Sequence, residues 1–187
     1  KWENVPDKYA ALGGRGLTSR IVSDEVPATC EPLGPDNKLV FAPGLLSGTN
    51  APSSGRFSVG GKSPLTGGIK EANSGGVASQ KLASLGIKAL VIEGQPADKN
   101  LYILKVTTEG AELLPAGEAA GKGGYETVTM LKKKFGEKVA VIFIGLLEKC
   151  SWLTPGSAVT TPKATPPATQ DAAVWAPLWG PKASRRS

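Results

Sequence analysis

The chain has 187 residues, 40% of them hydrophobic and 20% charged, as is typical of one globular domain. Half of its net charge of +6 comes from residues 146–187, and the basic run at 132–134 has the pattern of a solvent-exposed helix end. We therefore expect no nucleic-acid partner. No apolar stretch reaches the roughly 20 residues of a membrane span, and histidine is absent, which excludes Ser-His-Asp and Cys-His nucleophilic schemes. Cys30 and Cys150 lie far apart in the sequence, so a disulfide framework, a zinc ribbon or an iron–sulfur cluster within this chain is not expected.

The periodicity of apolar residues predicts a mixed succession of helices and strands. Two short helices are expected within residues 6–26, separated at Gly13 and Gly14, and residues 62–76 (KSPLTGGIKEANSGG) read as a long polar loop. The remaining predicted elements are helices over 76–85 and 125–135, closed by Gly86 and Gly136, and strands over 38–42, 56–60, 88–93, 101–106, 111–114 and 138–144. This order predicts an α+β fold in which β-sheets are packed by a few helices.

The composition changes after Gly145. Residues 146–187 contain six of the fifteen prolines and three of the four tryptophans, and their apolar residues follow no period. Such a segment is typical of a disordered linker, so the sequence predicts a domain over 1–145 and a Pro-rich tail over 146–187. No signal or transit peptide is visible at Lys1, so we expect a cytoplasmic location.

A glycine-rich stretch over residues 55–76 is the strongest candidate for a binding site. Its glycines permit positive φ angles and close backbone approach to a phosphate or a planar ring, and the helix expected from Gly76 directs its positive end to the same place. Arg56 has the geometry to bind a phosphate with two hydrogen bonds, and the Asn73 amide suits the mixed edge of a pterin. On spacing alone, plain turns, a surface arginine and an asparagine helix cap are the slightly favoured explanation of the same residues.

Two further glycine-rich patterns are weaker. The spacing from Gly55 to Lys62 and Ser63 is one residue too long for a P-loop, and Pro64 follows where the P-loop helix would begin. Residues 13–16 (GGRG) are typical of a turn, although Arg15 is able to help hold an anion. A basic phosphate- or nucleotide-binding module with a disordered interaction tail therefore stays open as an alternative function.

Five segments resemble the N-terminal domain of the tungsten-containing aldehyde ferredoxin oxidoreductase family, in the same order. They are GGRGL (13–17), EPLGPDNKLVFAPGLLSGTNAPSSGRF (31–57), KSPLTGG (62–68), ANSGG (72–76) and KALVIEG (88–94). The resemblance extends from the start of the chain to Gly145 and implies two β-sheets that carry a bis-pterin cofactor of tungsten or molybdenum. Family members have an additional strand pair before this region, so we expect a domain truncated at both ends.

The resemblance also implies a set of functional residues and partners. It assigns cofactor contacts to Arg56, Asn73, Ser74 and Gly75, and the backbone carbonyl of Asn73 to a bridging magnesium ion. Family members oxidise aldehydes to carboxylic acids and pass electrons through a 4Fe–4S cluster to ferredoxin. The cluster ligands and catalytic residues belong to downstream domains, so this chain alone is expected to be inactive, and a homodimer is left open.

The tail is compatible with a shifted reading frame. Codons permitted for residues 145–154 (GLLEKCSWLT) also encode PAGEMLLA in a neighbouring frame, and those for residues 169–187 also encode AGRGGLGAVMGSKGLKAI. Both sequences resemble the family at this point, and the second is its other pterin and magnesium contact in this domain. We therefore interpret residues 146–187 as a frameshifted translation with no structure or function of its own.

Overall fold

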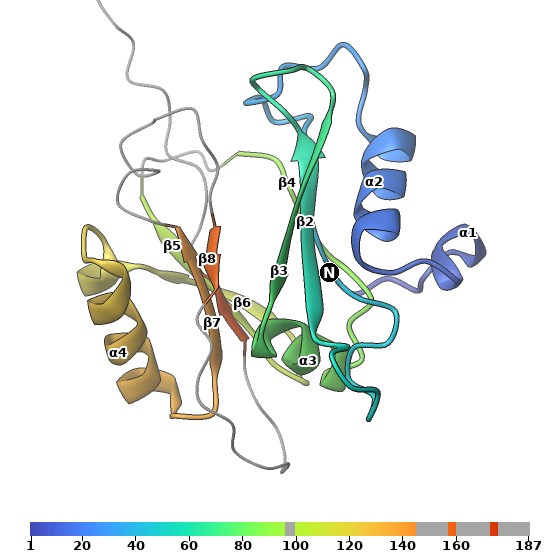
Figure 1. Ribbon diagram of the computed structural model, residues 1–187. Coiled ribbons are helices and arrows are strands. Elements are labelled where there is room, and N and C mark those ends of the chain that lie inside the picture. Colours follow the sequence, from blue (N-terminus) through green and yellow to red (C-terminus); the bar gives the residue numbers. More distant parts are fainter. Residues whose placement is uncertain (96–99, 145–156, 160–172, 176–187) are drawn as a thin grey trace, which may run out of the picture.

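The computed structural model describes residues 1–95, 100–144, 157–159 and 173–175. Within these ranges the chain forms a four-stranded sheet and a five-stranded sheet that are packed by helices (Figure 1). The predicted α+β class with two β-sheets is confirmed.

The four-stranded sheet, here called sheet A, is antiparallel with the strand order β3-β2-β1-β4. Its strands are β1 (Lys38–Pro43), β2 (Arg56–Lys62), β3 (Ile69–Gly75) and β4 (Leu90–Glu93). Strand β1 lies inside the sheet, and four consecutive buried residues at its end account for its strongly apolar sequence.

The prediction of a long loop over residues 62–76 is wrong for β3. Seven residues of β3 pair with β2 in one continuous register, from Ile69 opposite Lys62 to Gly75 opposite Arg56. Among the described strands β3 is at an edge of sheet A, and none of its residues is fully buried. Its sequence therefore lacks the alternation of apolar and polar residues that marks a half-buried strand, which explains why composition suggested a loop.

The five-stranded sheet, here called sheet B, has the order β6-β5-β9-β7-β8. Its strands are β5 (Tyr102–Val106), β6 (Ala111–Pro115), β7 (Ala140–Ile144), β8 (Ser157–Val159) and β9 (Ala173–Trp175). Because β8 and β9 belong to the tail, the expectation of a tail without regular structure is wrong for these six residues. They pair along the backbone edges of β5 and β7, which offer unpaired amides and carbonyls to any extended segment. The rest of the tail lies outside the described residues.

The predicted helices are present with small changes in their bounds. They are α1 (Asp7–Ala10), α2 (Gly14–Glu25), α3 (Val77–Ser84) and α4 (Gly124–Phe135), and a 3-10 turn spans Gly117–Ala119. Gly86 and Gly136 follow α3 and α4 with φ angles of 73° and 104°. Both glycines were expected as helix ends because a side chain is strained in this conformation.

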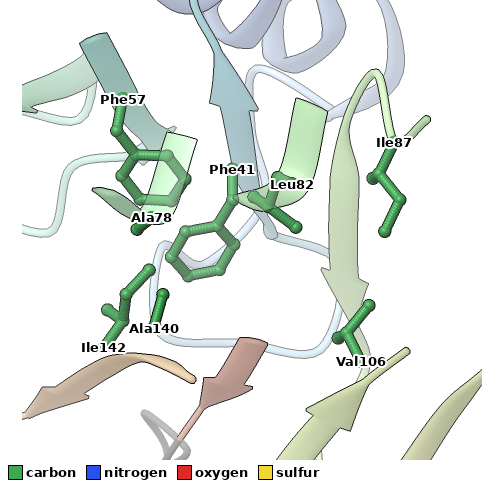
Figure 2. Close-up of a cluster of buried hydrophobic side chains, with 8 residues drawn as sticks. All are labelled: Phe41, Phe57, Ala78, Leu82, Ile87, Val106, Ala140 and Ile142. Carbon is green, nitrogen blue, oxygen red and sulfur yellow. The ribbon is translucent and has the colours of Figure 1, made fainter. Parts of the chain in front are cut away.

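A central core joins the two sheets. Figure 2 shows Phe41 and Phe57 of sheet A on one side and Ala140 and Ile142 of β7 on the other, with Leu82 of α3 beside them. The two phenylalanine rings are stacked with their centroids 6.0 Å apart. Helix α2 covers the outer face of sheet A, and α4 covers the outer face of sheet B (Figure 1). The apolar faces of α2 and α4 thus form two further buried clusters, one on the outer face of each sheet.

Candidate functional site

Several glycine-rich segments converge at one end of sheet A, where β2 begins and β3 ends. The position that a side chain would take at Gly13 lies 2.6 Å from the backbone nitrogen of Leu45, and the same position at Gly44 lies 3.4 Å from the carbonyl oxygen of Arg56. The contact at Gly13 requires glycine because a Cβ atom would collide with backbone, whereas the contact at Gly44 is only close. The GGRG run and the β1–β2 loop are therefore packed against the start of β2.

The alternation of β2 assigns its residues to the two faces of sheet A. Phe57 belongs to the central core, so Arg56, Ser58 and Gly60 lie on the opposite face, under α2. A Cβ atom at Gly60 would lie 2.7 Å from the Cβ of Thr18, and one at Gly14 would lie 3.5 Å from the Ser58 hydroxyl oxygen. Helix α2 thus covers Gly60 and Ser58 and begins at Gly14, which leaves Arg56 beyond its N-terminus.

Arg56, Asn73 and Ser58 form one hydrogen-bonded chain at this place. The Arg56 guanidinium donates to Oδ1 of Asn73 at 3.5 Å, and Nδ2 of Asn73 donates to the Ser58 hydroxyl at 2.8 Å. Ser58 is directly opposite Asn73 in the register of β2 and β3 and is fully buried, whereas Arg56 and Asn73 are exposed. The buried Ser58 hydroxyl is thus bonded to the exposed Asn73 amide, which in turn is bonded to the exposed Arg56 guanidinium.

Ser74 and Gly75 complete the end of β3 rather than a turn. The Ser74 hydroxyl donates to the carbonyl of Gly75 at 3.1 Å, and Gly75 has open space at its Cβ position, where the nearest atom is 4.0 Å away. Gly76 follows with a φ of 121° and serves as the N-cap of α3. All four residues expected at the cofactor therefore lie in the three residue pairs where β2 begins and β3 ends. These pairs are Arg56 with Gly75, Phe57 with Ser74, and Ser58 with Asn73.

No side chain of the N-cap residue accepts a hydrogen bond from the first-turn amides of α2 or α3. The interpretation of Asn73 as the cap of α3 is wrong, because its amide is bonded to Ser58 and Arg56 instead. Uncapped helix N-termini carry partial positive charge, which Arg56 increases at the same end of sheet A. This end of the sheet is suited to a negatively charged group.

Lys62, which a P-loop would need at a phosphate, has a different function. It lies at the opposite end of β2, and its ammonium donates to the carbonyls of Ala28 at 2.5 Å and Cys30 at 2.7 Å. The backbone N–H of Lys62 also donates to Oδ1 of Asn37 at 3.0 Å, and Nδ2 of Asn37 donates to the backbone carbonyl of Lys62 at 3.1 Å. The Lys62 ammonium thus binds the segment that precedes β1, at the end of β2 opposite to Arg56.

Outside this end of sheet A, the described residues offer little for ligand chemistry. They include no group of three or more acidic, cysteine or histidine side chains that is able to hold a metal ion. None of the helices within them is long and apolar enough to cross a membrane. Cys30 is a free, partly buried thiol, and Cys150 lies outside the described residues.

Ser58 is the site residue that the sequence did not indicate. A serine inside a short strand carries no motif. The available signal is the strand period, because residue 58 shares a face with Arg56, but its partner strand β3 has the composition of a loop.

Comparison with known proteins identifies the family. The family model of the aldehyde ferredoxin oxidoreductase N-terminal domain matches residues 1–147. The tungsten-containing aldehyde ferredoxin oxidoreductase of Pyrococcus furiosus is 44% identical over 135 residues, which cover 72% of this chain and 22% of that relative. The corresponding protein of Pyrococcus horikoshii is 42% identical over 148 residues, covering 78% of this chain and 24% of the relative. The chain thus spans less than a quarter of the length of these relatives.

Among solved structures, the active site complex BamBC of benzoyl coenzyme A reductase, in complex with 1,5-dienoyl-CoA, is similar to this chain with a TM-score of 0.62 and 30% sequence identity. The match covers 71% of this chain and 20% of that one. The resemblance of the sequence motifs is therefore confirmed, and the chain belongs to the aldehyde ferredoxin oxidoreductase family, matching the N-terminal domain of its members over residues 1–147.

Proposed function

We propose that this chain provides one side of the binding site for a tungsten- or molybdenum-containing bis-pterin cofactor, with Arg56, Asn73, Ser74 and Gly75 as its contacts. The observation that carries the proposal is the position of these residues together at one end of sheet A, beyond the start of α2 and just before α3. The tungsten-containing relatives give the class of cofactor.

The residues at this end have properties that fit such a cofactor. The exposed guanidinium of Arg56 suits a phosphate or the acceptor atoms of a pterin, and the open Cβ position of Gly75 allows a flat ring to approach the backbone. The hydroxyl of Ser54, two residues before Arg56, is buried without a hydrogen-bond partner in the described structure. An unsatisfied buried hydroxyl beside the site is a position where a bound group would supply the missing partner.

Magnesium would be held by the backbone carbonyl of Asn73. Strand β3 is at the edge of sheet A among the described strands, so alternate carbonyls along it have no partner strand. Magnesium prefers oxygen ligands and is often shared between a protein and phosphates. A backbone carbonyl beside a phosphate-bearing cofactor suits this preference.

When bound, the metal–pterin group would supply the redox chemistry that oxidises an aldehyde to a carboxylic acid, with ferredoxin as the electron acceptor. The role of this chain is to bind and orient that group through Arg56 and the end of β3. The 4Fe–4S cluster, the catalytic residues and the aldehyde pocket belong to downstream domains of the same cytoplasmic enzyme. The 187-residue chain alone is expected to oxidise no aldehyde, and reduction of a viologen dye by the purified chain would contradict this.

The test is metal and pterin analysis of the full-length enzyme that carries this domain. Wild-type enzyme should contain tungsten or molybdenum and release a fluorescent pterin, and Arg56→Ala should lower the cofactor content roughly 10-fold or more. Arg20→Ala is the matched control because Arg20 is also exposed but pairs with Asp24 on α2. A protein free of metal and pterin that binds nucleic acid in a salt-sensitive manner would instead support the phosphate- or nucleotide-binding alternative.

We also propose that residues 146–187 are translated in a shifted frame. The family model ends at residue 147, close to the predicted break at Gly145, which supports the proposal. In the restored frame the chain would regain the AGRGG stretch that the family resemblance assigns to the other side of the cofactor. Independent sequencing of the encoding DNA that gives an unshifted frame would contradict it.

A further inference from the structure

We propose that Ser58 is a positioning residue for the cofactor site, a role that rests on the proposed function. Ser58 is fully buried, yet its hydroxyl is bonded to the exposed Asn73 amide at 2.8 Å. It therefore lies behind the predicted contact residues rather than among them. The hydroxyl binds the Asn73 amide from the buried side, while Arg56, which is only a donor, selects the orientation in which Oδ1 faces it.

The orientation of the amide follows from the hydrogen-bonding capacity of each group. Arginine is a donor only, so the guanidinium of Arg56 requires the carbonyl oxygen of the Asn73 side chain. The NH₂ group of Asn73 must then point the other way, where the Ser58 hydroxyl accepts from it. One hydroxyl thus stabilises the orientation in which Asn73 Oδ1 and Arg56 stand together at the solvent-facing edge.

The packing around Ser58 leaves little freedom for its side chain. A Cβ atom at Gly14 would lie 3.5 Å from the Ser58 hydroxyl oxygen, and Gly14 itself has a φ of 50°, which favours glycine. The first residue of α2 therefore lies over the hydroxyl, at a distance where an added Cβ atom would be in ordinary contact with it. Ser58 is held between α2 and Asn73.

Without the Ser58 hydroxyl, the Asn73 NH₂ group loses its internal acceptor, so the orientation with Oδ1 toward Arg56 is less favoured. Both rotamers of the amide then become accessible, and Arg56 loses the acceptor that orients it. Residues that orient direct ligands of a cofactor typically contribute about 10–100-fold to its binding or activity. We expect Ser58→Ala to lower the retained metal–pterin content of the full-length enzyme by roughly 10-fold.

The experiment compares Ser58→Ala with Ser63→Ala in the full-length enzyme. Ser63 is a matched control because it is also buried and its hydroxyl accepts the backbone N–H groups of Leu65 and Thr66, but it lies past the opposite end of β2. Both variants should reduce thermal stability, whereas only Ser58→Ala should reduce the metal and pterin content per chain. Ser58→Cys, which is slightly larger than serine but a weak acceptor, should lower the cofactor content as Ser58→Ala does, and agreement between the smaller and the larger variant excludes a cavity effect.

A second readout needs no cofactor. In the 187-residue chain, hydrogen exchange of the Asn73 side-chain NH₂ group followed by NMR should be slower than that of the exposed Asn50, and Ser58→Ala should remove the difference.

The outcomes separate the two proposals. Full cofactor content in both Arg56→Ala and Asn73→Ala would overturn the proposed site itself. Loss of cofactor in those two variants, together with full content in Ser58→Ala and unchanged exchange of the Asn73 amide, would overturn only the role of Ser58.

Discussion

Gly76 is the residue at which the backbone geometry of the site is most directly testable. It has φ 121° and ψ −170°, a region that essentially only glycine adopts, and it joins the end of β3 to the first turn of α3. Gly76→Ala therefore forces either a strained backbone, at about 1–3 kcal/mol, or a shift of the Ser74 and Gly75 positions. For a loss of ~2 kcal/mol and a denaturant slope of ~2 kcal/mol per molar, the urea midpoint should fall by roughly 1 M.

The matched control for this substitution is Gly16→Ala. Gly16 lies inside α2 without a positive φ, and no atom lies within 4 Å of its Cβ position. Alanine is favoured over glycine within a helix by about 0.5–1 kcal/mol, so this variant should be more stable than wild type. Urea unfolding of the 187-residue chain, followed by circular dichroism, measures both. An unchanged or higher midpoint for Gly76→Ala would show that the junction between β3 and α3 is not held as described.

Three further substitutions test the core, the ion pairs and the loop attachment. Leu82→Ala should reduce the free energy of unfolding by about 2–5 kcal/mol because Leu82 is fully buried. Leu65→Ala is the control, because the Leu65 side chain is 76% exposed and its removal should change the free energy of unfolding little. Equal effects of the two substitutions would contradict the described core. A hydrogen bond from Lys8 lowers the pKa of Asp24 below its ordinary 3.8, so its contribution is present above that pH and lost as the pH falls through the lowered value. The urea midpoint of Asp24→Asn should accordingly decrease less than that of wild type between about pH 5 and pH 3, and parallel curves would refute this. Lys62→Met should destabilise the chain by about 1–2 kcal/mol in the same urea assay, through two lost carbonyl contacts, and an unchanged midpoint would contradict the assignment of Lys62 to loop attachment.

The sequence was most informative where one strong local signal determined the structure. Gly86 and Gly136 end helices because their positive φ angles disfavour any side chain, and the apolar run of β1 is buried on both faces. Such features depend on a few neighbouring residues and can be predicted without tertiary contacts. Helix α3 was predicted for the same reason.

Strand β3 could not be predicted because its stability comes from pairing rather than from its own residues. It contains glycine, asparagine and charged residues, and only the continuous register with β2 makes it a strand. The glycines at 67 and 68 belong to the hairpin turn, where Gly67 has a φ of 70° and donates its N–H to the carbonyl of Ser63. The role of Ser58 is not predictable from the sequence for the same reason, because its contact with Asn73 exists only across β2 and β3.

The predicted contact residues at the end of sheet A do not pair with the tail strands that we propose are out of frame. The chain from Gly13 to Ser84 includes the predicted contacts, Ser58 and the start of α3, whereas the described tail segments pair only with β5 and β7 of sheet B. Sheets A and B contact each other through the central core, which includes residues of β5 and β7. This core lies on the inner face of sheet A, whereas Ser58 lies on the opposite face. We therefore expect the proposed change of frame after Gly145 to leave Arg56, Asn73 and Ser58 in the arrangement described here. It follows that the geometry of Arg56, Asn73 and Ser58 can be measured in this chain, independently of whether the chain retains a cofactor.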